Sequence, residues 1–323
     1  MKAASGALAE EVRNLQVQVD KLQKEAEARK KLQITDEEKK KKEEQILEAA
    51  GREYTLLPSG TLGLEYSLGY SYYSYDVLKE AFEVEHNANH SLTNTLVTEY
   101  AYKDNLTLNF NVPFVYKYNK VGTESEQDVT DLGDISFGVK YQPFKSGGDW
   151  PAPILSTSLI LPTSRGVYEI NPEKELSTGD GLYKASLGLS FSKPIDPVNA
   201  FASFNYTYAF EESGLHQNRG GAVLEKVDPG DSVGATLGLG YALSYKVSLS
   251  LSWSYSYGFE TEYHWKGGGT SKSGSSVSSS LNLSTGWHLS PKQSIILGVG
   301  VGLTDDNADF SFSFRWPFEY DLR

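Results

Sequence analysis

The segment from Val247 to Phe259 alternates between apolar and serine positions along most of its length. One parity holds Val247, Leu249, Leu251, Trp253, Tyr255, Tyr257 and Phe259, and the other holds Ser248, Ser250, Ser252, Ser254 and Ser256. A period of two predicts a β-strand with one apolar and one polar face. Residues 233–243 repeat the pattern, and only Ser244 to Lys246 separate the two segments, which predicts an antiparallel hairpin.

A strand of this length is about twice the usual strand of a soluble sheet, and about the length that crosses a bilayer when tilted. The sequence has no run of about eighteen apolar residues, so no transmembrane helix is expected. A polar average composition is compatible with a barrel, because each strand exposes only every second residue to lipid. The 21 tyrosines suit the aromatic girdles of such a barrel.

Composition excludes several classes of function. The absence of cysteine removes disulfides, thiolate metal sites and cysteine nucleophiles. A net charge of −12 disfavours nucleic acid as a partner. Met1 is not followed by the apolar core of a signal peptide, so a protein that crosses an inner membrane is expected to be represented here in a processed or truncated form.

Residues 1–51 form a predicted helical arm, and residues 52–323 a predicted barrel. A stripe of apolar residues steps by four and three and suits one partner surface: Leu8, Val12, Leu15, Val19, Leu22 and Ala26. Thr35 to Glu38 reads as a capping box that opens a second helix, with Gly51 as its C-terminal cap. Four consecutive lysines, Lys39 to Lys42, point all round that helix, so much of it is expected in water.

From about Gly60 to the end the period is two, which predicts an all-β transmembrane fold. About twelve strands follow, at 62–72, 92–102, 106–116, 135–141, 155–161, 183–191, 202–210, 233–243, 247–259, 277–287, 295–303 and 310–318. An even number predicts a 12-stranded antiparallel outer-membrane β-barrel with an N-terminal α-helical arm or plug.

The connections between these strands alternate in length. Short ones lie at 103–105, 143–152, 192–199, 244–246 and 288–292, whereas longer, mostly acidic ones lie at 76–90, 119–133, 162–180, 211–231 and 260–274. The short segment 304–308 is the exception in the second set. Outer-membrane barrels have short periplasmic turns and long outer loops, so both termini of the barrel and the start of the arm are expected in the periplasm.

If the apolar parity faces lipid, the other parity lines the lumen with small, polar and sparsely charged residues. The predicted lining comprises Glu65, Glu99, Asn109, Asn111, Lys117, Lys140, Lys184, Asn205, Ser250, Ser252, Ser254, Asn282 and Arg315. Twelve strands enclose more width than side chains alone fill, which favours a pore for something bulky. The alternative is that small residues relieve crowding in a filled barrel.

Three interpretations of the arm remain open. The stripe joins protomers as a coiled coil, or part of the arm enters the lumen as a plug, or the arm is a solvated linker. We favour the first helix, about 8–32, as the plug, seated by Leu8, Val12, Leu15, Val19 and Leu22. The lysine-rich helix then lies near the periplasmic mouth and leads into the first strand.

No catalytic or cofactor motif stands out, and we expect no cofactor, no metal and no enzyme. His86 and His90 have a helical metal-ligand spacing, but the segment HNANH is a candidate loop without a third ligand. His288 and Ser290 have the spacing of the outer-membrane phospholipase pair, yet they lie at a predicted periplasmic turn. The acidic loops 124–134 and 211–231 could bind cations, although solvated loops are the simpler interpretation.

Three segments carry a resemblance to a known family: DLGDISFGVKYQPF at 131–144, APILSTSLILPTSRG at 152–166 and STGDGLYKASLGLSFSK at 177–193. They resemble the outer-membrane transporter family associated with the MetA pathway of phenol degradation. Among barrels of this kind, the lysine-rich arm resembles that of the FapF-like secretion channels of bacterial functional-amyloid systems.

The second resemblance implies a homotrimer of plugged barrels that export unfolded amyloid subunits, with a coiled coil upstream of Leu8. Expected partners are the amyloid subunit, the lipid bilayer and lipopolysaccharide, and no nucleic acid. The alternatives are a diffusion channel for small aromatic or apolar compounds, and a barrel enzyme with lipase activity.

Overall fold

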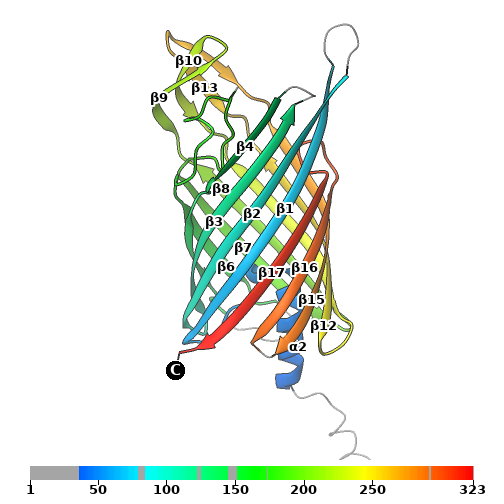
Figure 1. The fold of residues 1–323 in the computed structure, drawn as a ribbon. Coiled ribbons are helices and arrows are strands. Elements are labelled where there is room, and N and C mark those ends of the chain that lie inside the picture. The colour runs from blue at the N-terminus through cyan, green and yellow to red at the C-terminus, as the bar shows by residue number, and fades with distance from the viewer. Residues whose placement is uncertain are drawn as a thin grey trace, which may run out of the picture. The chain divides into compact units, whose positions relative to one another are not determined.

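The predicted barrel is confirmed. A computed structural model describes residues 36–78, 84–121, 125–144, 151–172, 174–290 and 292–322. Within these residues, twelve strands pair in a closed antiparallel ring, tilted as Figure 1 shows. In ring order they are β1 (Thr61–Leu78), β2 (Val84–Lys103), β3 (Leu106–Val121), β5 (Ser136–Tyr141), β6 (Ile154–Ile160), β7 (Lys184–Ile195), β8 (Val198–Ala209), β11 (Ser232–Ala242), β12 (Val247–Gly258), β15 (Ser276–Ser290), β16 (Gln293–Gly302) and β17 (Phe310–Asp321).

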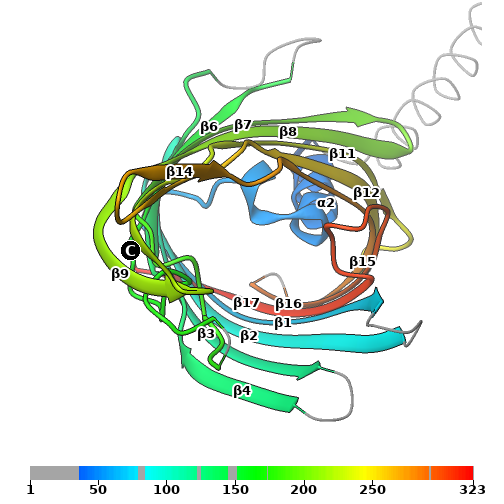
Figure 2. The same ribbon diagram turned by 90° about the horizontal axis from the view of Figure 1, so that it is seen from above.

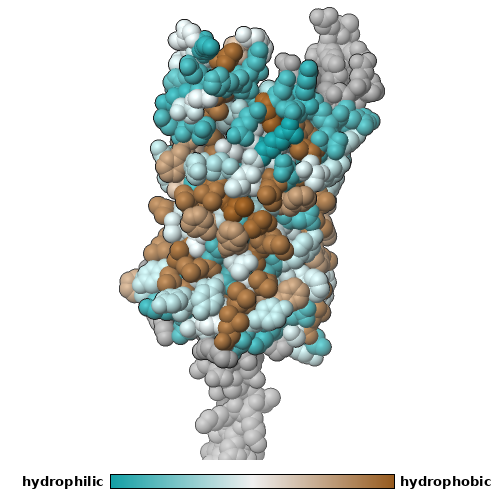
Figure 3. All heavy atoms as spheres, turned by 60° about the vertical axis from the view of Figure 1, so that its left-hand side comes forward, coloured by the Kyte–Doolittle hydropathy of each residue, from teal (hydrophilic) through white to brown (hydrophobic). Residues whose placement is uncertain are grey.

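The first and last strands close the ring. β1 pairs with β17 from Thr61 opposite Asp321 to Tyr72 opposite Phe310. The predicted hairpin is present, since β11 and β12 pair from Ser232 opposite Gly258 to Ala242 opposite Ser248. Large apolar side chains are exposed on the outer wall, for example Leu237, Leu251 and Leu281 on neighbouring strands. Figure 3 shows this apolar zone between more hydrophilic ends, as a bilayer-spanning wall requires.

At the end of the barrel that carries the long connections, the strands are longer, and more numerous, than the period-two pattern predicted. Four connections predicted as loops contain strand: residues 76–78 and 84–90 belong to the ends of β1 and β2, and 119–133 includes β4 (Ser125–Leu132), which pairs with β3. A separate sheet, visible above the barrel in Figure 1, combines β9 (Glu212–Arg219), β10 (Ala222–Asp228), β13 (Glu262–Trp265) and β14 (Gly269–Lys272). These segments alternate less cleanly because they lie beyond the lipid-facing zone.

The loop 162–182 folds against this outer sheet. The carboxylate of Asp134 accepts hydrogen bonds from the backbone N–H groups of Ser164, Asp180 and Gly181 at 3.1, 2.9 and 3.2 Å. Gln217 of β9 donates its side-chain amide to the carbonyl oxygens of Val167 and Ile170. The loop is therefore an ordered part of the outer rim.

In the same loop, Tyr168 stacks on the guanidinium of Arg219, whose carbon lies 5.5 Å from the ring centroid. Arg219 also lies 5.4 Å from the ring centroid of Tyr263 on β13, so one cation joins two aromatic rings of the rim. Burial raises the pKa of the Tyr168 hydroxyl to about 12.

The compact unit that contains the barrel begins at Glu44, within α2 (Asp36–Ala50). Residues 44–57, which we call the inserted segment, comprise the end of α2, the short 3₁₀ helix η1 (Arg52–Tyr54) and the link to β1. Figure 2 looks along the barrel and shows this segment inside the ring of strands. The most buried apolar side chains of the segment are Ile46, Leu47, Ala49 and Tyr54, each less than 6% exposed.

The lysine-rich helix leads into β1 as expected, but its end is not in water, as had been expected of much of the helix. Its last turns pack in the lumen because Ile46, Leu47 and Ala49 follow the lysine run and form a short apolar face. The predicted plug residues Leu8, Val12, Leu15, Val19 and Leu22 lie outside the described residues. Among the described helices, none has the length and apolar character needed to span a bilayer.

Candidate functional site: the seat of the inserted segment

A buried ion cluster holds Arg52 to the barrel wall. The Nε of Arg52 donates to Glu65 of β1, and its Nη1 donates to Glu99 of β2, both at 2.7 Å. Lys140 of β5 donates to Glu99 at 2.5 Å and to the carbonyl oxygen of Arg52 at 2.8 Å. The Glu65 and Glu99 side chains are only 4% and 6% exposed. The planar fork of arginine suits two carboxylates on neighbouring strands, which a lysine ammonium would not match.

A second set of polar contacts fixes the end of α2. Ser294 of β16 donates to the Glu48 carboxylate at 2.6 Å, and His288 Nδ1 of β15 lies 3.5 Å from the same carboxylate. Arg315 of β17 donates to the carbonyl oxygens of Glu48 and Ala49 at 2.9 and 3.3 Å. Helix-terminal carbonyls lack partners within the helix, so the Arg315 cation satisfies groups that would otherwise be buried without hydrogen bonds.

Apolar contacts complete the seat. The ring of Tyr54 packs at a tilt of 50° against Phe201 of β8 with centroids 4.7 Å apart, and its hydroxyl donates to Ser203 at 3.1 Å. Phe201 points inward on a parity otherwise occupied by small polar residues. Gly240 of β11 is required at its position, because an added Cβ would overlap the Cγ2 methyl of Ile46. The wall is therefore shaped to receive the helix.

A cavity of about 380 Å³, bordered mostly by residues with polar or charged side chains, lies beside the ion cluster. Many of the predicted lining residues surround it together with Arg52 and Glu53, namely Glu65, Glu99, Asn109, Asn111, Lys140, Asn205 and Arg315. The remaining predicted residues lie elsewhere on the wall. Lys184 forms an ion pair with Asp180. Ser250 is buried, with 3% of its surface exposed.

Two further predicted lining residues, Asn282 and Ser254, share a hydrogen bond on the inner faces of neighbouring strands. Asn282 donates to Ser254 at 3.5 Å and to Ser280 at 3.1 Å. Ser252 stands opposite Asn282 in the register of β12 and β15. Lys117 of β3 is opposite Ser91 of β2. The structure thus gathers half of the predicted lining at one cavity and distributes the rest along the barrel.

The candidate metal residues do not come together in the structure as a helical spacing would bring them. HNANH lies in β2 and not in a loop, so His86 and His90 are about 13 Å apart along an extended strand, too far to share one ion. His288 Nε2 lies 3.5 Å from Ser248 of β12. The described residues contain no group of three side chains able to hold a metal.

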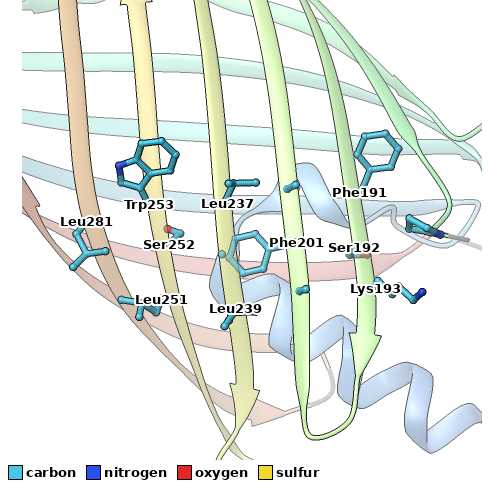
Figure 4. A pocket seen from close by; sticks show the side chains of 14 residues that line it. Phe191, Ser192, Lys193, Phe201, Leu237, Leu239, Leu251, Ser252, Trp253 and Leu281 are labelled. Atoms are coloured by element: carbon cyan, nitrogen blue, oxygen red, sulfur yellow. The ribbon is translucent and has the colours of Figure 1, made fainter.

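An apolar groove of about 550 Å³ marks the outer wall over β7, β8, β11, β12 and β15. Figure 4 shows the side chains that border it, including Phe191, Leu237, Leu239 and Trp253. From β8, Ala200, Phe201 and Ala202 line it, and the two alanines leave a depression between the larger side chains of the neighbouring strands. The groove belongs to the surface that faces lipid.

Several residues of the seat were not singled out by sequence reasoning: Glu48, Arg52, Tyr54, Asn199 and Phe201. One signal was present for Phe201, which is an aromatic residue on the polar parity of its strand. No comparable signal marks Arg52, because its partners Glu65 and Glu99 are 13 and 47 residues away.

A closed, lipid-facing antiparallel barrel with a polar lumen defines the class of outer-membrane β-barrel channels. Residues 67–316 match the family described as "Putative MetA-pathway of phenol degradation", and the chain belongs to that family.

Among solved structures, the chain is similar to the COG4313 outer membrane channel from Pseudomonas putida F1. The two share 15% identity and a TM-score of 0.62, over 83% of this chain and 98% of that one. It also matches the transport unit of the autotransporter AIDA-I from Escherichia coli, with 12% identity, a TM-score of 0.49, and coverage of 80% of this chain and 90% of that one. The COG4313 likeness shows the fold.

Proposed function

We propose that this protein is a gated outer-membrane channel, and that the inserted segment is the plug of its closed state. The single observation that carries the proposal is the burial of Arg52 between Glu65 and Glu99 on the lumenal wall. These ionic groups hold a segment inside a lumen that twelve strands make wide enough to conduct. We propose further that the short turns and both ends of the barrel face the periplasm, as in related architectures.

Electrical recording from purified protein in planar bilayers tests the plug. Deleting residues 1–57 removes the whole inserted segment and is expected to raise single-channel conductance severalfold. Deleting residues 1–34 leaves that segment in place, and is expected to leave conductance close to that of the full chain. Equal conductance of the full chain and the 1–57 deletion would refute the closing role.

Small aromatic compounds are one class of cargo, and the description of the family supports it. In this case the open lumen conducts phenolic solutes by diffusion without a protein partner. The test is uptake of labelled phenol by cells that express the channel or the 1–57 deletion. Faster uptake by the deletion supports this cargo, and uptake equal to that of cells without the channel rejects it.

Unfolded amyloid subunits are a second class of cargo that we propose, on the basis of the residues that line the cavity beside Arg52. The cavity beside Arg52 is bordered mostly by charged residues, amides and hydroxyls, together with Val97, Leu187 and Gly188. An extended polypeptide has a polar backbone and variable side chains, which such a surface accommodates. Co-expression with an amyloid subunit tests it: surface fibrils should require the channel.

A further inference from the structure

The side-chain amide of Asn199 is buried without a hydrogen bond. It is 2% exposed, on the lumenal face of β8, and among the described residues neither its Oδ1 nor its Nδ2 has a partner. Burying an amide in this way destabilises the state in which it occurs. The closed state therefore contains a polar group that gains from opening.

Asn199 lies in the part of the wall that receives the inserted segment. It stands opposite Gly240 in the register of β8 and β11, and Gly240 is the position against which Ile46 packs. Two residues along β8, the ring of Phe201 packs against Tyr54 and covers Gly238. We call Asn199, Phe201, Gly238 and Gly240 the peptide seat.

The present occupant of the peptide seat is itself a peptide with aliphatic and aromatic side chains. Gly240 leaves room for the Ile46 side chain of the occupant, Gly238 leaves room for the ring of Phe201, and Phe201 offers an aromatic face. Asn199 carries one acceptor and one amide donor, the same pair that a peptide group presents. The seat thus combines a side-chain contact with an unused pair of main-chain hydrogen-bonding groups.

We propose that the peptide seat binds an extended polypeptide in transit, and that the inserted segment and the cargo occupy it in turn. Asn199 then pairs with the backbone of the cargo, and Phe201 contacts its aliphatic or aromatic side chains. This inference rests on the second cargo class above, that of unfolded polypeptides. It assigns two effects to Asn199: the residue destabilises the closed state, and it stabilises the state in which cargo is bound.

Single-channel recording of the full-length protein tests both effects. The probe is a synthetic unstructured peptide of Gly, Ser and Asn with interspersed Tyr and Ile, added on the side of the short turns. Asn199→Leu replaces the amide with an apolar group of similar size. It is expected to lower the open probability about tenfold and to shorten the peptide's blocking time about tenfold, the order of one unpaired buried hydrogen-bonding group.

Thr236→Val is the matched control, because it removes a lumenal hydroxyl from β11 whose bond is to Ser254 and not to the inserted segment. It should leave the peptide's blocking time as in the wild type. Asn199→Ser makes a smaller change that a barrel strand tolerates easily, and should give intermediate values for both quantities.

The inference is overturned if Asn199→Leu and Asn199→Ser both have the open probability and the peptide blocking time of the wild type. It is also overturned if phenol, and not the peptide, produces the block that depends on Asn199. Either result leaves the plug itself intact, because the 1–57 deletion reports on closure separately.

Discussion

Replacing Arg52 with alanine is expected to open the channel. Arg52 makes two charge-assisted hydrogen bonds at 2.7 Å, and its own side chain is 16% exposed. Removing one partner of a buried ion pair costs about 3–5 kcal/mol, because the other charge stays buried. Lys140 continues to neutralise Glu99, and the cavity beside Glu65 is bordered mostly by residues with polar or charged side chains, so we take the lower end of this range.

A loss of about 3 kcal/mol corresponds to a rise of about 150-fold in the ratio of open to closed channels. The assay is the open probability of single channels at fixed voltage and neutral pH. Arg52→Lys should fall between wild type and Arg52→Ala, because it keeps the charge and loses the planar fork.

Arg165→Ala serves as a control, since Arg165 pairs with Glu175 in the outer loop at a site where both side chains are more than a third exposed. It should not change the open probability. The reasoning is refuted if Arg52→Ala opens no more often than Arg165→Ala, because the buried ion cluster would then contribute nothing to closure.

Three further substitutions test other contacts. Gly240→Val should displace Ile46 and raise the open probability about tenfold or more, whereas Gly274→Val, at a site with no neighbouring atoms, should not. Glu48→Ala removes the carboxylate that bonds to β16, and should raise the open probability about tenfold; an unchanged value would show that this end of the helix does not limit opening. Asp134→Ala removes three backbone bonds from the loop 162–182, so limited proteolysis should cut that loop severalfold faster with unchanged conductance.

The barrel could be predicted from the sequence because its pattern is local. Each strand alternates between lipid and lumen, so Val247 to Phe259 indicates its own conformation without reference to any partner. The outer strands β9, β10, β13 and β14 were missed, because they lie beyond the zone where lipid imposes that alternation.

The seat could not be predicted for the opposite reason. Arg52 joins strands that begin 9 and 32 residues later at Thr61 and Val84, and no local period records such a pairing. The lysine run also led to the prediction that the second helix lies largely in water, so the short apolar face that follows it at Ile46, Leu47 and Ala49 was not recognised. The long stripe from Leu8 to Leu22 led to a different plug assignment, the first helix, which lies outside the described residues. The 1–34 deletion distinguishes the two plugs, because a rise in conductance would support the first helix and not the inserted segment.

The polar contacts of the inserted segment have a consequence for biogenesis. They reach β1 and β2 through Arg52, β16 through Glu48, and β17 through the carbonyl oxygens that Arg315 binds. The seat is therefore incomplete until the last strand has been synthesised and paired with the first. A nascent barrel passes through an unsealed stage during membrane insertion, and ionic leak across the membrane should subside only when β17 joins β1.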